Sequence, residues 1–595
     1  MVKSYKFSAE KYSEQLLEIL LALKSRPEVV WTKFLREFPK PEGGIFAKYQ
    51  LMIGYHHLVA AGKLEEDEAL LAKLVMKPTR SISGVAPLTV LTKPFPCPGK
   101  CIFCPNDIRM PKSYLSDEPG AQRAERNSFD PYLQTYNRLR AFKATGHNID
   151  KIELIILGGT WSYYPKAYQN WFIKRCFDAL NDFGVRDGRD QVHTVNQFSS
   201  QTKNKAIFDK DGKRVSYNTQ VMQVELGART KAKLAQSPSA KVSEEMVTDE
   251  QLVQAQLLNE TALSRCVGLV IETRPDHIDE AEVKRVRFLG ATKTQIGFQS
   301  LSDEVLSLNK RGHDVAATSR AVALVRTGGF KIHAHWMPNL YGSNPQLDKQ
   351  DFDKLFTPEF QPDELKLYPC SLIESAELMD YYNKGLWKPY TQEELLDVLV
   401  HAISNTPRHV RLTRIIRDIP STDIVAGNKK TNFREMVQRH MESVGLRSQD
   451  IRSREIKGKH VSLSDLGLKV STYSAMNYLG PTTEHFLEFI TEQDEIAGFL
   501  RLSLPENKEN FIDELAGKAI IREIHVYGIA QQLGQNKQNA AQHLGLGSKL
   551  IEKAVQMAKE AGFKDLSVIS AIGTRGYYRK KGFTDGELYQ HMQIA

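Results

Sequence analysis

The sequence has few cysteines and no long apolar run. Six cysteines occur in 595 residues, too few for the disulfide framework of a small secreted protein. No stretch approaches the roughly 18 consecutive apolar residues that suggest a membrane-spanning helix. The N-terminal residues MVKSYKFSAEKYSEQ contain no apolar core of a secretory signal. These absences predict a cytoplasmic protein without a membrane partner.

The net charge of +9 is small for the length of the chain, but the charge is unevenly distributed. From Arg408 to Lys459 there are 13 lysines and arginines against 6 aspartates and glutamates. A surplus of this kind can bind polyanions by displacing counterions from phosphates. A solvated surface segment is the alternative interpretation.

The first two regions differ in pattern. Residues 1–80 place apolar side chains at helical spacing, with lysines and arginines between them. They predict a helical region that either binds nucleic acid or caps the next domain. Residues 81–400 alternate short apolar runs with helical stretches, which predicts an α/β barrel or a doubly wound sheet. The clearest strand candidates, whose apolar runs predict burial on both faces, are 152–157, 267–271, 294–298 and 331–336.

Three further segments complete the predicted organisation. Polar sequence at 185–250 is interpreted as a surface insertion without chemistry. Residues 401–460 are predicted to be a basic linker. Residues 461–595 are predicted to form a smaller α/β domain, with a glycine-rich turn followed by an amphipathic helix. Its expected strands are 484–490, 495–504 and 518–527.

Half of the cysteines lie close together. Cys97, Cys101 and Cys104 have the spacing C-x3-C-x2-C, which allows three thiolates to bind three irons of a [4Fe–4S] cluster and leaves the fourth iron open. A structural zinc site would need a fourth protein ligand. The other three cysteines stand alone and are interpreted as buried core thiols. The loop, with Phe103 before its last cysteine, resembles the radical-SAM signature, which implies S-adenosylmethionine as cosubstrate.

Further stretches fit site walls at the carboxyl ends of strands. Gly158 and Gly159 close a predicted strand and resemble the radical-SAM glycine motif that holds the methionine moiety, although a simple strand-to-helix turn is the commoner role of such a pair. The segments 272–276 (ETRPD) and 295–300 (QIGFQS) also follow strands. Polar groups at strand ends are often only loop caps, but after a three-cysteine loop they favour a site.

The glycine-rich turn of the last domain has a second signature. The segment 542–548 (QHLGLGS) matches the Q-x-x-G-x-G pattern of GNAT acetyltransferases, in which loop amides and a helix N-terminus hold the pyrophosphate of coenzyme A. Predicted strands at 521–526 and 566–571 flank it in the required order. The segment 573–583 resembles the GNAT stretch in which a tyrosine lies near the thioester sulfur. Packing on the sheet is the alternative for one of Tyr577 and Tyr578.

Both signatures on one chain, with the stretches KLYP (366–369) and RDIP (417–420), resemble the catalytic subunit of Elongator from about residue 80 to the end. The resemblance implies a radical-SAM partial (β/α) barrel, a C-terminal GNAT α/β domain and an N-terminal helical region. It implies synthesis of 5-carboxymethyluridine at the wobble position of the tRNA anticodon. In that reaction a deoxyadenosyl radical takes hydrogen from the methyl of acetyl-CoA, the carbon radical adds to C5 of uridine, and thioester hydrolysis releases the product.

The resemblance also implies roles for individual residues. Cys97, Cys101 and Cys104 would bind the [4Fe–4S] cluster. Lys151, otherwise interpreted as a surface lysine, and Tyr578 would reach the reacting end of acetyl-CoA and would be catalytic. The expected cofactor-binding residues are Lys151, Gly158, Gly159, Glu523, Ile524, His525, Val526, Leu546, Gly547, Ser548 and Tyr578.

The sequence departs from the family pattern in two ways, and several questions stay open. The first cysteine gap is shorter than in eukaryotic members, and the insertion at 185–250 is long. Members can carry zinc, but the sequence does not choose among His277, His313, His333, His335 and Cys370. A homodimer and accessory subunits are both open. The rival interpretations are a protein lysine N-acetyltransferase with a structural iron–sulfur domain and a non-catalytic tRNA-binding scaffold.

Overall fold

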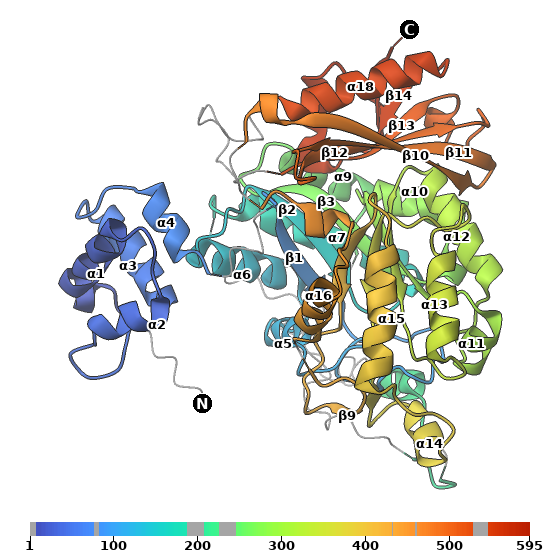
Figure 1. The fold of residues 1–595 in the computed structure, drawn as a ribbon, viewed down its shortest axis with the longest axis horizontal. Helices are drawn as coiled ribbons and strands as arrows, with labels where there is room; N and C mark the ends of the chain where they lie inside the picture. Colours follow the sequence, from blue (N-terminus) through green and yellow to red (C-terminus); the bar gives the residue numbers. More distant parts are fainter. Residues whose placement is uncertain are drawn as a thin grey trace, which may run out of the picture.

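The protein is described by a computed structural model over residues 7–76, 83–186, 208–212, 214–224, 246–430, 432–457, 461–527 and 545–594. It contains an N-terminal helical unit and two seven-stranded sheets (Figure 1). Within the described ranges, no helix combines the length and the apolar character that a membrane crossing requires.

The N-terminal unit is a small helical bundle with its own core. Leu16, Ile19, Leu20 and Leu23 recur at helical spacing and are fully buried, so one stripe of the first helix faces the core. In Figure 1 the unit stands beside the first sheet, where α3 contacts α6. Its helices are α1 (Ser13–Ser25), α2 (Trp31–Phe34), α3 (Lys48–Ala60) and α4 (Glu68–Leu74).

The first sheet consists of seven parallel strands in chain order, as the partial barrel prediction requires. Helices between the strands cover one face, as crossover connections of a parallel sheet do. The strands are β1 (Ala86–Leu91), β2 (Lys151–Leu157), β3 (Arg265–Thr273), β4 (Lys293–Gln299), β5 (Lys331–Trp336), β6 (Glu364–Leu367) and β8 (Arg411–Ile415). The larger helices are α5 (Pro119–Arg126), α6 (Pro131–Ala144), α7 (Lys166–Asp182), α9 (Asp249–Asn259), α10 (Glu280–Phe288), α11 (Asp303–Leu308), α12 (Val315–Thr327), α13 (Pro345–Lys354), α14 (Leu378–Asn383), α15 (Gln392–Asn405) and α16 (Phe433–Ser443).

The four strand candidates are confirmed. Burial on both faces holds for 294–298 of β4 and for 332–336 of β5, where every residue is buried, but not for β2. In β2, Ile152, Leu154 and Ile156 are at most 1% exposed, whereas the alternate residues Lys151 and Glu153 are partly accessible. Because side chains alternate along a strand, one face of β2 packs under helices and the other lines open space. The inner face of this sheet is therefore available for polar side chains.

The segment predicted to be a basic linker instead belongs largely to the first sheet. Residues 401–460 include β8, which pairs with β6, and the helices α16 and α17 (Ile451–Arg454). A separate two-stranded sheet pairs β7 (Leu372–Ile373) with β9 (Ile424–Ala426). Several of the arginines that suggested a polyanion-binding surface form ion pairs within the fold. These pairs are Arg408–Glu488, Arg411–Glu455, Arg417–Glu118 and Arg454–Glu488.

The second sheet is mixed and carries the C-terminal helices. Strands β10 to β13 are antiparallel, whereas β13 and β14 run parallel. The sequence predicted the cores of β11, β12, β13 and β14 but not β10, whose residues are mostly exposed. The elements are β10 (Gly467–Asn477), β11 (Gly480–Ile490), β12 (Ile496–Pro505), β13 (Ala519–Val526), α18 (Leu546–Glu560), β14 (Asp565–Val568), α19 (Arg575–Arg579), β15 (Thr584–Asp585) and β16 (Gln590–Gln593).

Buried ion pairs connect the two sheets. Asp363, directly before β6, accepts hydrogen bonds from the Arg522 guanidinium of β13, one of them at 3.1 Å. Arg522 also donates to Glu484 at 2.9 Å, and Arg501 of β12 lies 3.3 Å from Asp363. All four side chains are at most 2% exposed. Although burial opposes it, the charges of Arg522 and Arg501 lower the pKa of Asp363.

Replacing Asp363 with asparagine should weaken the junction of the two sheets. Two buried guanidinium groups each lose one of their two carboxylate partners, so the free energy of unfolding in urea should fall by roughly 3–5 kcal/mol. Since the folded pKa is lowered, the carboxylate stabilises the fold above its unfolded pKa of about 4, and that contribution is lost as the pH falls further. Asp363→Asn should therefore also lose less stability on acidification than the unaltered chain.

Asp353→Asn is the matched control, because Asp353 is 53% exposed and pairs with His401 at the surface. Its expected cost is below about 1 kcal/mol. Equal losses in the two variants would contradict a dominant role for the buried junction.

Candidate functional site

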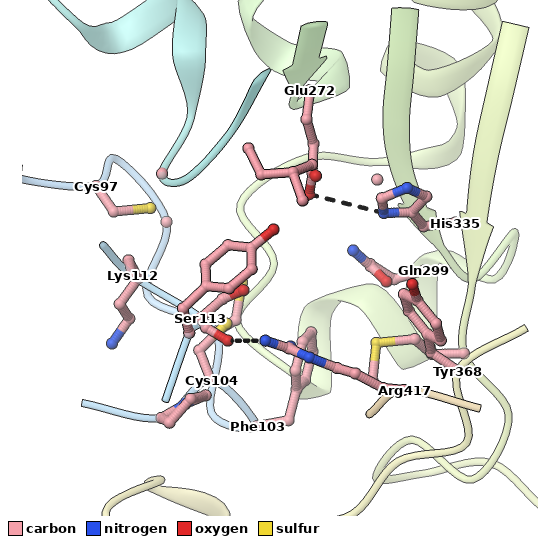
Figure 2. Close-up of a pocket in the computed structure, with 18 of the residues that line it drawn as sticks. Cys97, Phe103, Cys104, Lys112, Ser113, Glu272, Gln299, His335, Tyr368 and Arg417 are labelled. Atoms are coloured by element: carbon pink, nitrogen blue, oxygen red, sulfur yellow. Dashed lines mark hydrogen bonds and ion pairs between the residues drawn. The ribbon is translucent and has the colours of Figure 1, made fainter. Parts of the chain in front are cut away.

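The three cysteines lie on the loop that follows β1, at the carboxyl end of the first sheet (Figure 2). Cys97 and Cys101 are buried and Cys104 is partly exposed. The loop is fixed from two distant segments. Asn218 bonds both the amide and the carbonyl of Cys97, at 2.9 and 2.8 Å, and the carbonyl of Asn309 accepts from the amide of Ile102 at 3.2 Å.

Asn218 lies in the segment that the sequence predicted to be an insertion without chemistry. Residues 214–224 of that insertion pack against the cysteine loop, and Tyr217 donates to the carbonyl of Met110 at 2.7 Å. Residues 187–207, 213 and 225–245 lie outside the described ranges. A polar sequence that looked like surface therefore includes a segment that positions the first cysteine.

Two arginines approach the sulfur of Cys101, of which the sequence pointed to Arg274 only as part of the ETRPD stretch and to Arg311 not at all. Arg311 donates to Sγ of Cys101 at 3.2 Å, and Arg274 lies 3.9 Å from the same sulfur. A hydrogen bond from Cys104 and the charges of Arg311 and Arg274 lower the pKa of Cys101 well below its usual range, despite burial. The thiolate is the form that binds metal. Only the occurrence of Arg274 in the ETRPD stretch gave a signal for this contact.

The cysteines form the wall of a cavity of about 180 Å³. Its other walls come from the carboxyl ends of strands, where Gly158, Gly159, Glu272, Gln299 and His335 lie. Glu272 and His335 face each other across the cavity at 3.8 Å (Figure 2). Burial raises the pKa of Glu272 and lowers that of His335. The cavity is hereafter called the cysteine cavity.

The glycine pair is required by local geometry. Gly158 has φ +149°, and a Cβ atom there would lie 1.8 Å from the hydroxyl oxygen of Thr92. That hydroxyl also bonds Tyr164 at 2.8 Å, so it is not free to move away. A Cβ at Gly159 would lie 3.2 Å from the Tyr164 hydroxyl. Glycine at these positions therefore lets this wall of the cysteine cavity pack directly against Thr92 and Tyr164.

A second cavity of about 850 Å³ lies between the two sheets. It brings Lys151 of the first sheet together with Glu523 to Val526 of β13, Gly547 and Tyr578. Leu546 and Ser548 flank Gly547 at the start of α18, but Leu546 is fully buried in the core. Residues 542–544 of the glycine-rich motif lie outside the described ranges. This space is hereafter called the interdomain cavity.

The strands of the second sheet diverge where they meet this cavity. β13 pairs with β14 only from Ala519 to Ile521, and its register with β12 shifts between Arg501 and Leu502. Beyond Ile521, one edge of β13 has no pairing with β14, so its backbone can bond an extended ligand. The interdomain cavity is therefore bordered on one side by β13, up to Val526, and on another by the start of α18.

Side chains in the interdomain cavity have altered proton affinities. Burial lowers the pKa of Lys151 and lowers that of His525 to about 4, so His525 is neutral near pH 7. Nε2 of His525 has no hydrogen-bond partner among the described residues. Glu523 is held by Lys331 and by Arg501, the latter at 2.9 Å. Burial raises the pKa of Tyr578, which keeps its phenol protonated.

The structure does not gather the zinc candidates into a site. Within the described ranges, no three His, Cys, Asp or Glu side chains converge on a single-ion position. His333 and His335 are buried in β5, whereas His277 and His313 flank Asp276. The three loop cysteines are equally not arranged around one ion, but a [4Fe–4S] cluster spreads its ligands over separate irons. The donor set of three thiolates on one loop fits a [4Fe–4S] cluster whose fourth iron stays open.

A parallel partial barrel with a three-cysteine loop at the carboxyl ends of its strands, joined to a GNAT-type sheet, defines the class of radical-SAM proteins with a C-terminal GNAT-type domain. Residues 362–443 match the family model of the Radical_SAM C-terminal domain. This match covers β6, β8 and α16, which supports their assignment to the first domain.

The relatives define the family. The chain is 38% identical over 536 residues, or 87% of each chain, to a Methanocaldococcus infernus protein named tRNA uridine(34) acetyltransferase. It is 31% identical to the human protein named Elongator complex protein 3, over 88% of this chain and 87% of that one. A solved structure of archaeal Methanocaldococcus infernus Elp3 with an N-terminal deletion aligns with a TM-score of 0.64 at 33% identity, covering 86% of this chain and 99% of that one. The chain belongs to the family that contains the tRNA uridine(34) acetyltransferases and Elongator complex protein 3.

The geometry at Gly158 predicts a specific defect in Gly158→Ala. A Cβ at this φ costs about 1–3 kcal/mol of strain, and the contact with Thr92 adds roughly 1–3 kcal/mol. The unfolding temperature should fall, and iron bound per chain after anaerobic reconstitution should decrease as the neighbouring loop shifts.

Gly480→Ala is the control that has the backbone strain of a positive φ without a steric contact. Gly480 has φ +137°, but no atom lies within 4 Å of the position that a Cβ would occupy, and the residue belongs to β11, outside both cavities. It should lose stability from strain alone and retain iron. Equal iron binding by both variants would argue against the tight fit at Gly158.

Proposed function

We propose that this chain transfers a carboxymethyl group derived from acetyl-CoA to C5 of the wobble uridine of tRNA. The observation that carries the proposal is that the cysteine cavity and the interdomain cavity share the strands of one sheet. The names of the relatives, tRNA uridine(34) acetyltransferase among them, support tRNA as substrate and an acyl donor as cosubstrate.

Cys97, Cys101 and Cys104 would hold a [4Fe–4S] cluster in the cysteine cavity. With S-adenosylmethionine bound, such a cluster supplies the one-electron cleavage that yields a 5′-deoxyadenosyl radical. The chain's own residues prepare the site. Arg311 stabilises thiolate at Cys101 by charge and hydrogen bonding, and the cavity wall at Gly158 and Gly159 allows the methionine moiety to lie against backbone.

The interdomain cavity would hold acetyl-CoA. The backbone of Glu523, Ile524, His525 and Val526 would bond the pantetheine along the part of β13 beyond its pairing with β14. Leu546, Gly547 and Ser548 would place amides at the pyrophosphate, where the N-terminus of α18 contributes positive potential. Tyr578, which stays protonated, and Lys151 would donate to the thioester end.

Several features of the partners follow from the family rather than from local contacts. The tRNA anticodon would approach the cysteine cavity, with basic residues of the N-terminal helical unit as a candidate contact. The name Elongator complex protein 3 favours accessory subunits, and a homodimer stays a prediction. The cytoplasm is the compartment in which tRNA substrate and a reduced cluster would both occur.

An anaerobic assay tests the reaction directly. The chain, reductant, S-adenosylmethionine, tRNA and acetyl-CoA labelled in its methyl carbon should place label in a uridine base, detected by nucleoside mass spectrometry. Cys101→Ala should lose the labelled uridine by at least 100-fold. Cys266→Ala, which removes a buried core thiol outside both cavities, should keep it. Acetylation of lysine in peptides that persists in Cys101→Ala without S-adenosylmethionine would instead favour the lysine acetyltransferase.

Lys151→Met should weaken acetyl-CoA binding without changing iron content. Loss of a charged donor in a buried cavity costs about 1.5–3 kcal/mol, or roughly 10- to 100-fold in Kd, measured by calorimetry. Lys174→Met is the control, because Lys174 pairs with Asp178 on α7, away from both cavities. Unchanged affinity in Lys151→Met would remove this lysine from the acetyl-CoA site.

A further inference from the structure

The cysteine cavity and the interdomain cavity lie at opposite ends of the same strands. On β6, Glu364 lines the interdomain cavity and Lys366 lines the cysteine cavity. On β5, Lys331 lines the former and His335 the latter. Residues two apart on a strand are separated by about 6.6 Å. Along β6, the two cavities are therefore about one side-chain layer apart.

On β4 and β5 that separating layer is polar, whereas Ile155 and Val270 hold the corresponding positions on β2 and β3. His333 of β5 and Gln295 of β4 are neighbours in register and are at most 3% exposed. His333 Nε2 lies 2.8 Å from the Thr413 hydroxyl of β8, and Nδ1 lies 3.3 Å from Glu364. The interior of parallel barrels is usually filled by branched apolar residues, so polar side chains on two adjacent strands of this layer are unusual.

Gln295 contacts residues of the cysteine cavity, whereas His333 contacts Thr413 and Glu364, which line the interdomain cavity. Gln295 Oε1 accepts from Lys366 at 2.6 Å and lies 3.1 Å from His335 Nε2, both of which line the cysteine cavity. On the other side, Glu364 pairs with Lys293 at 3.0 Å and Lys331 at 3.1 Å, both of which line the interdomain cavity. When His333 and Gln295 rotate, each can replace a lost hydrogen bond by one to another polar neighbour. Apolar side chains in the same place would lose packing contacts and leave an empty space.

We propose that the layer formed by His333 and Gln295 is the passage through which the acyl end of a coenzyme A thioester, bound in the interdomain cavity, reaches the cysteine cavity. The inference rests on the proposed function, because that reaction requires the methyl carbon to meet the chemistry at the cysteine loop. The direct path crosses one layer of side chains. His333 and Gln295 are thus positioning residues for the acyl group.

Affinity alkylation of a cysteine placed in the layer tests the passage. Cluster-loaded His333→Cys is treated anaerobically with bromoacetyl-CoA, which carries its reactive carbon where acetyl-CoA carries its methyl. The thiolate sulfur forms a bond to that carbon, bromide leaves, and the thiol proton passes to solvent. We expect one label per chain, located by peptide mass spectrometry, with at least ten-fold suppression by excess coenzyme A.

His485→Cys is the matched control, because His485 lies on β11 and borders neither cavity. It should react at least ten-fold more slowly, and excess coenzyme A should not protect it. Gln295→Cys provides a second position in the layer should His333→Cys fail to fold. Coenzyme A binding to each variant is measured by calorimetry.

Calorimetry distinguishes a failure of the proposed passage from a failure of the proposed acetyl-CoA site. If coenzyme A binds but neither layer variant is alkylated faster than His485→Cys, the passage is wrong while the acetyl-CoA site stands. If coenzyme A does not bind to the unaltered chain, the proposed function fails and the passage fails with it. Labelling that coenzyme A does not suppress would mean entry from solvent and would also overturn the passage.

Discussion

Buried arginine–carboxylate pairing between the two sheets is the constraint on which the sites depend. Arg522 and Asp363 carry full charges where water is excluded, and removing ions from water is favourable only when each finds partners. Those partners exist only in one relative placement of β6, β12 and β13. Arg501 extends the same pairing to Glu523, whose strand borders the interdomain cavity. The shape of that cavity is therefore set by charge pairing rather than by shape complementarity of apolar surfaces alone.

Local sequence was informative where chemistry depends on neighbours along the chain. The three-cysteine loop, the glycine pair and the strand ahead of α18 each have a short pattern with a direct physical reason, and the structure brings Lys151 to the same cavity as Tyr578. The parallel strands were equally visible, since their outward faces are continuous in apolar residues. The roles of these residues in binding stay predictions.

Contacts between segments far apart in the chain had no short sequence pattern from which they could be predicted. Arg311 reaches Cys101 across 210 residues, and nothing in the local pattern around either residue indicates this. The charge surplus from Arg408 to Lys459 suggested an exposed basic linker, yet Arg408 and Arg454 share Glu488, which is fully buried. A count of charges cannot distinguish a solvated surface from a folded ion-pair network, because both have the same composition.

The two hydrogen bonds between Asn218 and the backbone of Cys97 bear on the maturation of the protein. The two hydrogen bonds join residues 121 positions apart, and the second partner is synthesised long after the cysteine loop. The two hydrogen bonds that hold the backbone of the first cysteine form only when residues 214–224 have docked. Metal insertion coupled to folding is then expected to occur late, on a chain whose first sheet has largely formed, rather than on the nascent cysteine motif as it emerges from the ribosome.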